Sequence, residues 1–365
     1  MQVSTSSIPT RSGRHAPASS SCCIRRKIRT RERFGWSMRR WSNRSGGTSH
    51  RIELREKKMK RSPLVSGEPR NSCDWRTRMK RTLLSLLSAL LLLAFPSKSS
   101  AQLLATKDGP VVYGHHHLNT TNMAAQKKFF VETLGGKLVT IGTNNTEIVE
   151  FPNVLIFFRS TQAPTGGTRG TTVNHIGFSV PSLRPIVARV KANGFQMITN
   201  TEVPGREVKD DIAGPLQPGG ASIAFALGPD EVKVEFVEAK QQTIPITLHH
   251  VHFFNPKNTE MQAWYVKTFG AKPRSGGAFP AADLPGVALN FSPSTDPVVG
   301  TQGRALDHIG FEVKDLEAFC RKLEADGVKL AVPYRKVPAL GIAIAFITDP
   351  WGTYIEMTEG LDKVG

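Results

Sequence analysis

The sequence predicts an α+β fold built from repeated modules, each with one strand, one helix and three further strands. Short runs rich in apolar and β-branched residues are separated by Gly and Pro, as in "IAIAFITDPWGTYIEM" (342–357), which is typical of strands. Other segments have helical periodicity. Leu316, Phe319 and Leu323 share one face of a helix expected over 316–326, and Gly327 is placed to end it. Strands and helices therefore alternate within each repeat, which favours the mixed class.

Two long units follow each other along the chain. "HHHLNTTNMAAQKKFFVETLGG" (115–136) aligns without a gap with "HVHFFNPKNTEMQAWYVKTFGA" (250–271), at an offset of 135 residues. "VNHIGFSV" (173–180) then aligns with "LDHIGFEV" (306–313), and "VKVEFVEA" (232–239) with "TYIEMTEG" (353–360). The first copy carries a longer loop near 203–220. We therefore expect two domains, residues 111–240 and 245–360, joined near "KQQTIPIT".

Each unit also repeats internally. In the second, the strand "HHVHFF" (249–254) and a helix expected over 258–269 precede further strands. The strand "DHIGFEV" (307–313) and the helix over 316–326 then begin the pattern again. Each half of a unit thus has the order strand, helix and three strands.

The positive charge of the chain belongs to its N-terminal part. Residues 1–78 contain 20 Lys or Arg and 5 Asp or Glu, whereas residues 102–365 contain 25 of each kind. The formal charge of +18 is therefore no argument for a nucleic-acid partner of the main body. Residues 1–78 show no sustained period, so we expect them to be disordered. The alternative is an untranslated stretch, with Met79 as the true start.

Residues 79–101 resemble a signal peptide. The basic start (Lys80, Arg81), an apolar run of about 13 residues, and the small residues Ser99 and Ala101 fit that pattern. We expect cleavage after Ala101, export, and no membrane attachment afterwards; the alternative is an uncleaved anchor. The mature chain would keep a single cysteine, Cys320, without an internal disulfide, and we expect its thiol to pack in the core.

The histidines recur at matching strand positions. Because residues i and i+2 of a strand face the same way, His115 and His117 share one face, and so do His250 and His252. The histidines next to them, His116 and His249, should point the opposite way, with His116 expected at the surface.

Each unit adds a second strand histidine and a glutamate in an apolar strand, namely His175 with Glu235 and His308 with Glu356. Two imidazoles and one carboxylate suit a divalent metal such as Fe(II), Mn(II), Co(II), Ni(II) or Zn(II). A single such histidine is more often a core or edge residue, but recurrence of the whole triple favours a metal site.

The series "HHVHFF … LDHIGFEV … TDPWGTYIEM" resembles the vicinal oxygen chelate (VOC) superfamily, which includes glyoxalases, bleomycin- and fosfomycin-resistance proteins and extradiol dioxygenases. The resemblance covers about residues 111–360 and implies two tandem VOC domains, whose paired βαβββ modules curl around a metal. It implies one ligand set of His115, His175 and Glu235. A second, closer to the family pattern, would be His250, His308 and Glu356. The implied partner is a small substrate that chelates the metal through adjacent oxygens; no pattern fixes the oligomeric state.

Two departures from the family narrow the reaction. The second acidic ligand typical of glyoxalase I is missing, because Ile156 and Asn290 stand near its expected positions. The tyrosine typical of extradiol dioxygenases is replaced by Phe346, and by Phe225 in the first unit. We therefore expect an isomerase or lyase, with an extradiol-type dioxygenase and a non-catalytic binding or resistance protein as alternatives.

Further residues could take part in catalysis or binding. His252 and His117 are the acid–base candidates, because an imidazole titrates near neutrality. A merely buried strand residue is the alternative for His252. Arg206, Tyr334 and Arg335 precede central strands and could contact an anionic substrate, but the sequence favours the alternative that they are exposed loop residues.

Overall fold

The computed structural model describes residues 108–275 and 277–363. The extension 1–78 and the expected signal peptide 79–101 lie outside the described residues. Within the described part, no helix is long and apolar enough to cross a membrane.

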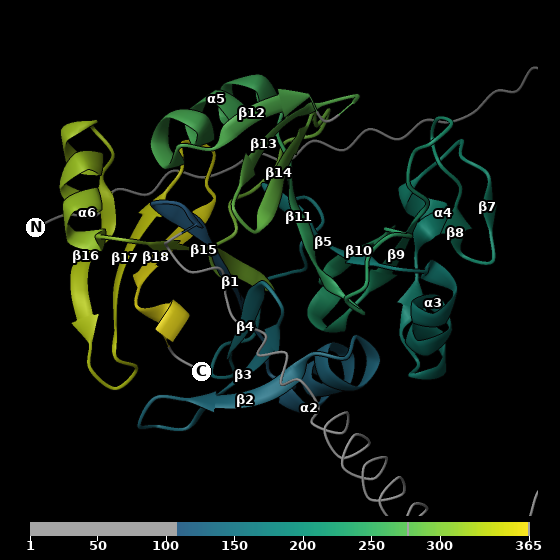
Figure 1. Ribbon diagram of the computed structural model, residues 1–365, viewed down its shortest axis with the longest axis horizontal. Helices are drawn as coiled ribbons and strands as arrows, with labels where there is room; N and C mark the ends of the chain where they lie inside the picture. The colour runs from purple at the N-terminus through teal and green to yellow at the C-terminus, as the bar shows by residue number, and fades with distance from the viewer. Residues whose placement is uncertain (1–107, 276, 364–365) are drawn as a thin grey trace, which may run out of the picture. The chain divides into compact units, whose positions relative to one another are not determined.

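Four modules follow each other along the chain (Figure 1). The first contains β1 (Val111–Asn119), α2 (Met123–Lys127), the π-helical turn η2 (Lys128–Thr133), β2 (Lys137–Ile141), β3 (Thr146–Phe151) and β4 (Val154–Arg159). The second contains β5 (Val173–Val180), α3 (Leu183–Ala192), β6 (Gln196–Met197), α4 (Thr199–Glu202), β7 (Val208–Lys209), β8 (Ile212–Ala213), β9 (Ile223–Leu227), η3 (Pro229–Glu231) and β10 (Lys233–Glu238).

The third module contains β11 (Thr247–Phe254), α5 (Asn258–Phe269), β12 (Lys272–Ser275), β13 (Pro280–Leu284) and β14 (Val287–Ser292). The fourth contains β15 (Leu306–Val313), α6 (Leu316–Ala325), β16 (Leu330–Val337), β17 (Ile342–Thr348), β18 (Tyr354–Glu359) and the turn η4 (Leu361–Lys363). The predicted α+β class and the strand–helix–three-strand modules are confirmed. The additional short strands β7 and β8 occupy the longer loop of the second module, and α4 directly precedes it.

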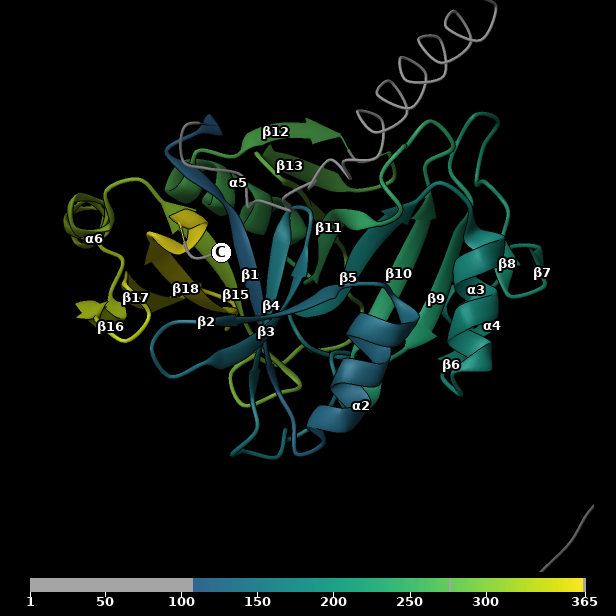
Figure 2. The ribbon, with the colours of Figure 1, turned by 60° about the horizontal axis from the view of Figure 1, so that its bottom comes forward.

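The two sheets join modules from different halves of the chain. The eight-stranded sheet has the order β16-β17-β18-β15-β1-β4-β3-β2, so it combines the fourth module with the first. The ten-stranded sheet combines the third module with the second, with β11 next to β5. β1 lies beside β15 (Figure 2) and runs antiparallel to it, which pairs His117 with His308. β11 runs antiparallel to β5 and pairs His252 with His175.

Helices α5 and α6 follow from the sequence pattern. α5 buries Met261, Tyr265 and Phe269 on one face, and Gly270 ends it in the left-handed conformation (φ 72°), which glycine adopts without a steric penalty. The side chain of Asp315 caps α6 by accepting a hydrogen bond from the backbone N–H of Ala318. Cys320 of α6 is a free, buried thiol, as expected.

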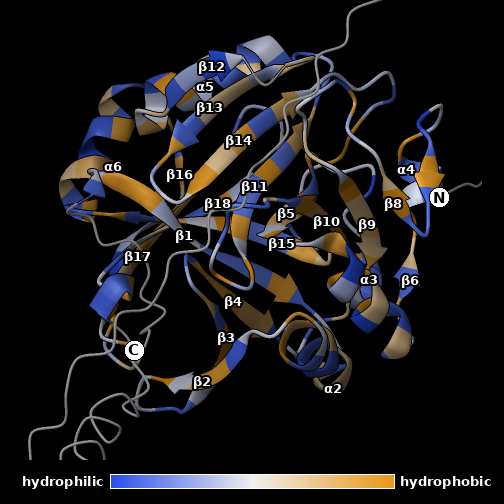
Figure 3. Ribbon diagram, turned by 45° about the vertical axis from the view of Figure 1, so that its right-hand side comes forward, coloured by the Kyte–Doolittle hydropathy of each residue, from blue (hydrophilic) through white to orange (hydrophobic). Residues whose placement is uncertain are grey.

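Two hydrophobic clusters lie against the sheets. The larger cluster packs residues of all four modules beneath the helices, including Phe178, Phe253 and Phe311. A smaller cluster lines one face of the eight-stranded sheet, with Phe157, Ile344 and Phe346 among its members. Figure 3 shows hydrophobic and hydrophilic residues alternating along helices such as α3, consistent with one buried and one solvent-facing side.

The buried carboxylate of Glu312 in β15 holds the C-terminal turn. It accepts hydrogen bonds from the backbone N–H groups of Gly360 and Leu361 and from the hydroxyl of Thr358. Burial nevertheless raises its pKa to about 7, since desolvation outweighs these hydrogen bonds. A pKa raised by folding favours the native state below the unfolded pKa, and this contribution disappears as pH rises from about 4.5 to about 7.

Replacing Glu312 with Gln should therefore remove a pH dependence of stability. Between pH 5 and pH 8 the free energy of unfolding of the wild-type protein should fall by on the order of 2–3 kcal/mol, and that of the E312Q variant should not show this fall. Urea unfolding at both pH values measures this difference. Glu317→Gln, at an exposed carboxylate on α6, is the control and should follow the wild type. Parallel pH profiles for E312Q and wild type would contradict the assignment.

Candidate metal centres

Three donors converge on the eight-stranded sheet, in what we call the eight-strand site: His115 of β1, His308 of β15 and Glu356 of β18. The Nε2 atoms of both histidines lie 2.9 Å from Oε2 of Glu356. All three residues are buried, and their donor atoms lie within 4.8 Å of one another. Two neutral imidazoles and one carboxylate make a set that fits a divalent metal and leaves positions open for other ligands.

A charged neighbour orients His308. Oδ1 of Asp307 lies 2.7 Å from Nδ1 of His308, which leaves Nε2 directed at the donor cluster. Burial lowers the pKa of His308, but the hydrogen bonds to Asp307 and Glu356 outweigh it and raise the pKa above its ordinary value. Burial raises the pKa of Asp307, yet the bond to His308 brings it down to about 2. Hydrogen bonds from His115 and His308 likewise overcome burial and lower the pKa of Glu356.

Four donors converge on the ten-stranded sheet, in what we call the ten-strand site: His175 of β5, Glu235 of β10, and His250 and His252 of β11. Oε2 of Glu235 lies 2.8 Å from Nε2 of His175 and 3.1 Å from Nε2 of His250. Nδ1 of His252 lies 3.1 Å from Nε2 of His175. This set also fits a divalent metal, with one more imidazole than the eight-strand site offers.

The pKa shift of His175 in the ten-strand site differs from that of His308 in the eight-strand site. The partner of His175 Nδ1 is the neutral amide of Asn174, at 2.9 Å, and burial lowers the pKa of His175 to about 3. Burial raises the pKa of Glu235, but His250 and His175 overcome it and hold the pKa well below its ordinary value. The carboxylate of Asp307 helps to raise the pKa of His308, whereas His175 has a neutral amide at that position and burial lowers its pKa.

The equivalent histidines His117 and His252 have different surroundings. Nε2 of His252 is hydrogen-bonded to Oγ of Ser292 at 2.8 Å, which directs Nδ1 toward the donors. The ring of His117 lies 4.6 Å from that of His308 between centroids, and its Nε2 atom has no hydrogen-bond partner in the described part of the chain. Burial, followed by neighbouring histidines, lowers the pKa of both rings. The structure therefore brings His252 into a donor set and leaves His117 beside one.

Two glycines that the sequence analysis did not single out make room for the ligand rings. A Cβ atom at Gly310 would overlap the ring of His115, and one at Gly177 would overlap the ring of His250. Each glycine pairs directly with that histidine across neighbouring strands. The "HIG" triplet shared by both copies is the sequence signal for this arrangement. Its histidine is a candidate metal ligand, and its glycine leaves room for the ligand histidine of the neighbouring strand.

The grouping implied by the resemblance is wrong. His115 lies with His308 and Glu356, whereas His175 and Glu235 lie with His250. The six predicted ligands all occupy the two sites, but each site takes one histidine from one half and a His–Glu pair from the other. The reason is the pairing of the first module with the fourth and of the second with the third.

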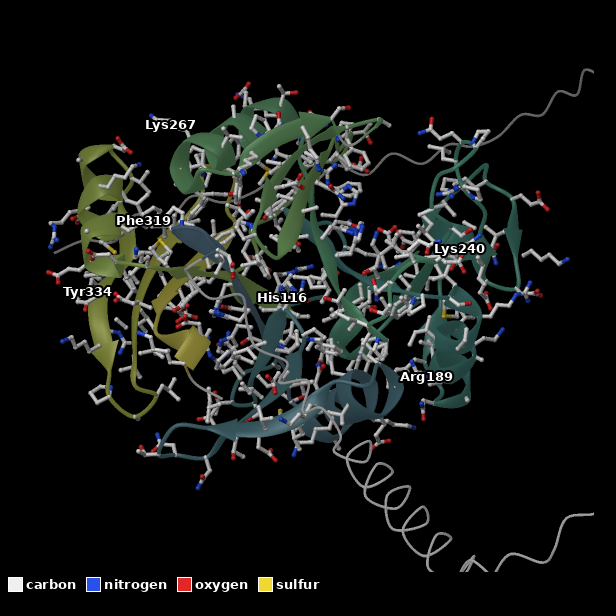
Figure 4. All side chains as sticks on the ribbon, in the orientation of Figure 1. His116, Arg189, Lys240, Lys267, Phe319 and Tyr334 are labelled. Atoms are coloured by element: carbon white, nitrogen blue, oxygen red, sulfur yellow. The ribbon has the colours of Figure 1, made fainter. Side chains whose placement is uncertain are left out.

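His116 points away from His115, as expected, but not into solvent, whereas His249 departs from the expected alternation. His116 is fully buried in the core, where its Nδ1 lies 2.9 Å from the hydroxyl of Tyr113, so its expected surface position is wrong (Figure 4). β1 is a central strand with both faces covered. His249 is exposed, but its Nδ1 lies 2.8 Å from Nδ1 of His250, because a β-bulge interrupts the register there.

Alanine substitutions at His115 and His116 should separate ligand from core. His115→Ala should lose the metal of the eight-strand site, since it removes one of three donors. His116→Ala should keep that metal and lower stability by about 2–3 kcal/mol, because it leaves a cavity and an unpartnered Tyr113 hydroxyl. Metal content per chain and chemical unfolding measure both effects. Equal metal loss in the two variants would contradict this assignment.

The positions of the family's missing groups are now defined. β4 places Phe157, not Ile156, opposite His117, and β14 places Asn290 opposite His252, so neither site gains a carboxylate there. Ile156 pairs with His116 and belongs to the core face. Phe346 lies beside His308, with ring centroids 5.2 Å apart, and Phe225 lies beside His175 at 5.4 Å.

The three residues proposed for anion contact are dispersed. Arg206 donates to the carbonyl of Gly214 in its own loop, and Tyr334 lies near Phe319 on the outer side of the fourth module (Figure 4). Arg335 lines a cavity of about 250 Å³ at the eight-strand site, together with His117. The ten-strand site lies on a larger depression of about 510 Å³, lined also by Lys233 and Asn290.

Comparison with known proteins agrees with this architecture. The sequence model of the Glyoxalase/Bleomycin resistance protein/Dioxygenase superfamily matches residues 247–357. No curated protein sequence matches the chain. Glyoxalase I from Zea mays has a similar structure, with a TM-score of 0.53 at 16% identity over 69% of this chain and 94% of that chain. A proposed dioxygenase from Bacillus subtilis gives a TM-score of 0.50 at 12% identity over 68% of this chain and 84% of that chain.

Proposed function

We propose that the chain, whose residues 247–357 match the model of the Glyoxalase/Bleomycin resistance protein/Dioxygenase superfamily, is a divalent-metal-dependent isomerase or lyase of that superfamily acting at the eight-strand site. The substrate is a small molecule that presents two adjacent oxygens. The observation that carries this proposal is the set of three donors, His115, His308 and Glu356, beside a cavity of about 250 Å³. Three protein ligands leave coordination positions for the substrate.

The residues of the eight-strand site divide the work. Glu356 supplies the negative charge that offsets the cation, while His115 and His308 supply neutral donors. A metal held there would act as a Lewis acid that stabilises negative charge developing on a chelated oxygen. His117 lines the same cavity and would move the proton between neighbouring atoms of the substrate. Apolar side chains such as Ile344 and Phe346 keep water away from the reacting atoms.

Phe346 is the observation that favours isomerase or lyase chemistry over ring cleavage. Its ring lies beside His308 and lines the cavity, at the position where the dioxygenase pattern has a tyrosine. A phenyl ring has no proton to exchange with a substrate. Apart from the three donors and the two arginines, the titratable side chain that lines the cavity is His117. His117 is therefore the candidate for proton transfer.

Metal analysis followed by a substrate panel tests the proposal. The mature protein is loaded with Fe(II), Mn(II), Co(II), Ni(II) or Zn(II) and offered α-hydroxyketones, 2-oxoacids and catechols, with and without oxygen. Turnover that needs no oxygen is the expected result. Oxygen consumption with a catechol would favour the dioxygenase alternative. Tight binding without turnover would favour a binding or resistance protein.

We also propose export, because residues 79–101 have the basic start, apolar run and Ser99-x-Ala101 end of a cleaved signal peptide. The expected N-terminus of the periplasmic or secreted protein is Gln102, as N-terminal sequencing would determine. Residues 1–78 on the mature protein would exclude this processing, and a membrane-bound product would support an uncleaved anchor.

A further inference from the structure

We propose that the eight-strand site takes an organic anion with an apolar body, and that Arg159 and Arg335 bind its carboxylate or phosphate group. This inference rests on the proposed function, since it names the substrate class for the same site. The cavity combines the donor cluster, an apolar wall and two guanidinium groups. Each of these three parts matches one part of such a molecule.

The two arginines lie on strands at either side of the cavity along the strand order of the sheet. Arg159 ends β4 and Arg335 lies in the edge strand β16, with β17, β18, β15 and β1 between them. Both nevertheless line the same cavity of about 250 Å³. Guanidinium groups that come from separate strands and meet at one cavity can hold an oxyanion from two directions, with several N–H donors each.

Neither guanidinium is neutralised by the protein in the described part of the chain. Other arginines there do form ion pairs; Arg274 lies 2.7 Å from Asp283 and Arg321 lies 3.0 Å from Glu317. Arg159 and Arg335 form none, and the carboxylate among the residues lining their cavity is Glu356, which already receives His115 and His308. The cavity therefore presents positive charge that a bound anion would balance.

The wall of the cavity selects for an apolar body. Leu340, Ile342, Ile344 and Phe346 line it beside the arginines. A molecule that is charged throughout would have to be desolvated against these side chains without compensation. A molecule with a hydrocarbon or aromatic part gains from the same contact.

The ten-strand site lacks both features and is an internal comparison. Its β11–β14 pairing places Ser292 opposite Phe254, where the β1–β4 pairing places Arg159 opposite Asn119. Its buried cation, Lys233, is already paired with Glu202 at 2.7 Å. Of the two sites, the eight-strand site is therefore the one that presents unpaired positive charge.

Binding to the metal-free protein tests the anion preference apart from catalysis. The chain is stripped with a chelator and titrated by calorimetry with 3-phenylpropanoate, phenyl phosphate and the neutral 3-phenylpropanamide. We expect at least one of the two anions to bind at least about tenfold more tightly than the amide. Added salt should reduce this preference, since the arginines are exposed.

Variants locate the preference. Arg159→Gln and Arg335→Gln should each lose most of the anion preference while unfolding at the same temperature as the wild type, because both side chains are exposed. Arg189→Gln, on α3 of the second module and outside the cavity lining, should keep it (Figure 4). Equal binding of anion and amide, unchanged preference in the two variants, or no binding of any probe would each overturn the inference.

The two proposals fail separately. Arginine-dependent anion binding by a protein that turns over no substrate would support the inference and remove the proposed catalysis. Turnover of a neutral substrate, unaffected by Arg159→Gln and Arg335→Gln, would keep the catalysis and remove the inference.

Discussion

Replacing Glu356 with Gln should weaken metal binding at the eight-strand site by at least about 100-fold and abolish turnover. Gln keeps the shape of the side chain but removes the negative charge that offsets the cation. It also disturbs both histidines, because His115 and His308 each hydrogen-bond to the same Glu356 oxygen. Loss of a residue that only orients a ligand already costs about 10–100-fold in affinity, so loss of the ligand itself should cost more.

The matched control for Glu356→Gln is Glu235→Gln in the ten-strand site. Each variant should lose the metal of its own site and keep the other, so that the mature chain retains one metal instead of two. Turnover should follow the eight-strand metal. Equilibrium dialysis with metal analysis measures both affinities. A Glu356→Gln protein that binds metal as tightly as the wild type would remove the eight-strand site from the mechanism.

His117→Ala and His252→Ala should have different effects although the two histidines occupy equivalent positions. His117→Ala should keep the metal and lower kcat by about 10²–10⁴-fold, the range for loss of a positioned acid–base group. His252→Ala should weaken metal binding at the ten-strand site, because its Nδ1 atom lies 3.1 Å from Nε2 of His175 and belongs to the donor set.

Cobalt substitution separates the two roles. The visible absorption of Co(II) depends on ligand number, so His252→Ala should change the spectrum of the ten-strand site and His117→Ala should leave both spectra unchanged. Unchanged turnover in metal-loaded His117→Ala protein would show that His117 is only a buried strand residue. An unchanged spectrum in His252→Ala protein would exclude His252 as a ligand.

Local features of the fold could be predicted from the sequence. The bounds predicted for helix α5, Asn258–Phe269, match the structure, and Gly327 placed the end of α6 within one residue. Both depend on neighbours within a few positions of the chain. The identity of the six candidate ligands was also predictable, because a repeated His, His and Glu at matching strand positions is a property of the sequence alone.

The grouping of these ligands could not be predicted in the same way. Which strand pairs with β1 depends on how whole modules pack, and β15 lies almost 200 residues away along the chain. The burial of His116 depends on the central place of β1 in its sheet. The position of His249 depends on one β-bulge, which adds a residue and breaks strict alternation.

The crossed pairing of modules implies an approximate twofold symmetry within one chain. One operation relates the first half to the second, and it exchanges the eight-strand site with the ten-strand site. A half-length chain with the same modules would contain no complete site and would leave β1 or β15 with an open edge. Two copies of such a chain would satisfy both needs by forming a symmetric dimer, with one site at each of two equivalent junctions. Because the halves are joined in one polypeptide, the two sites can differ in sequence. One site has Arg159 where the other has Ser292, and Asp307 where the other has Asn174. A symmetric dimer of identical chains could not contain such differences.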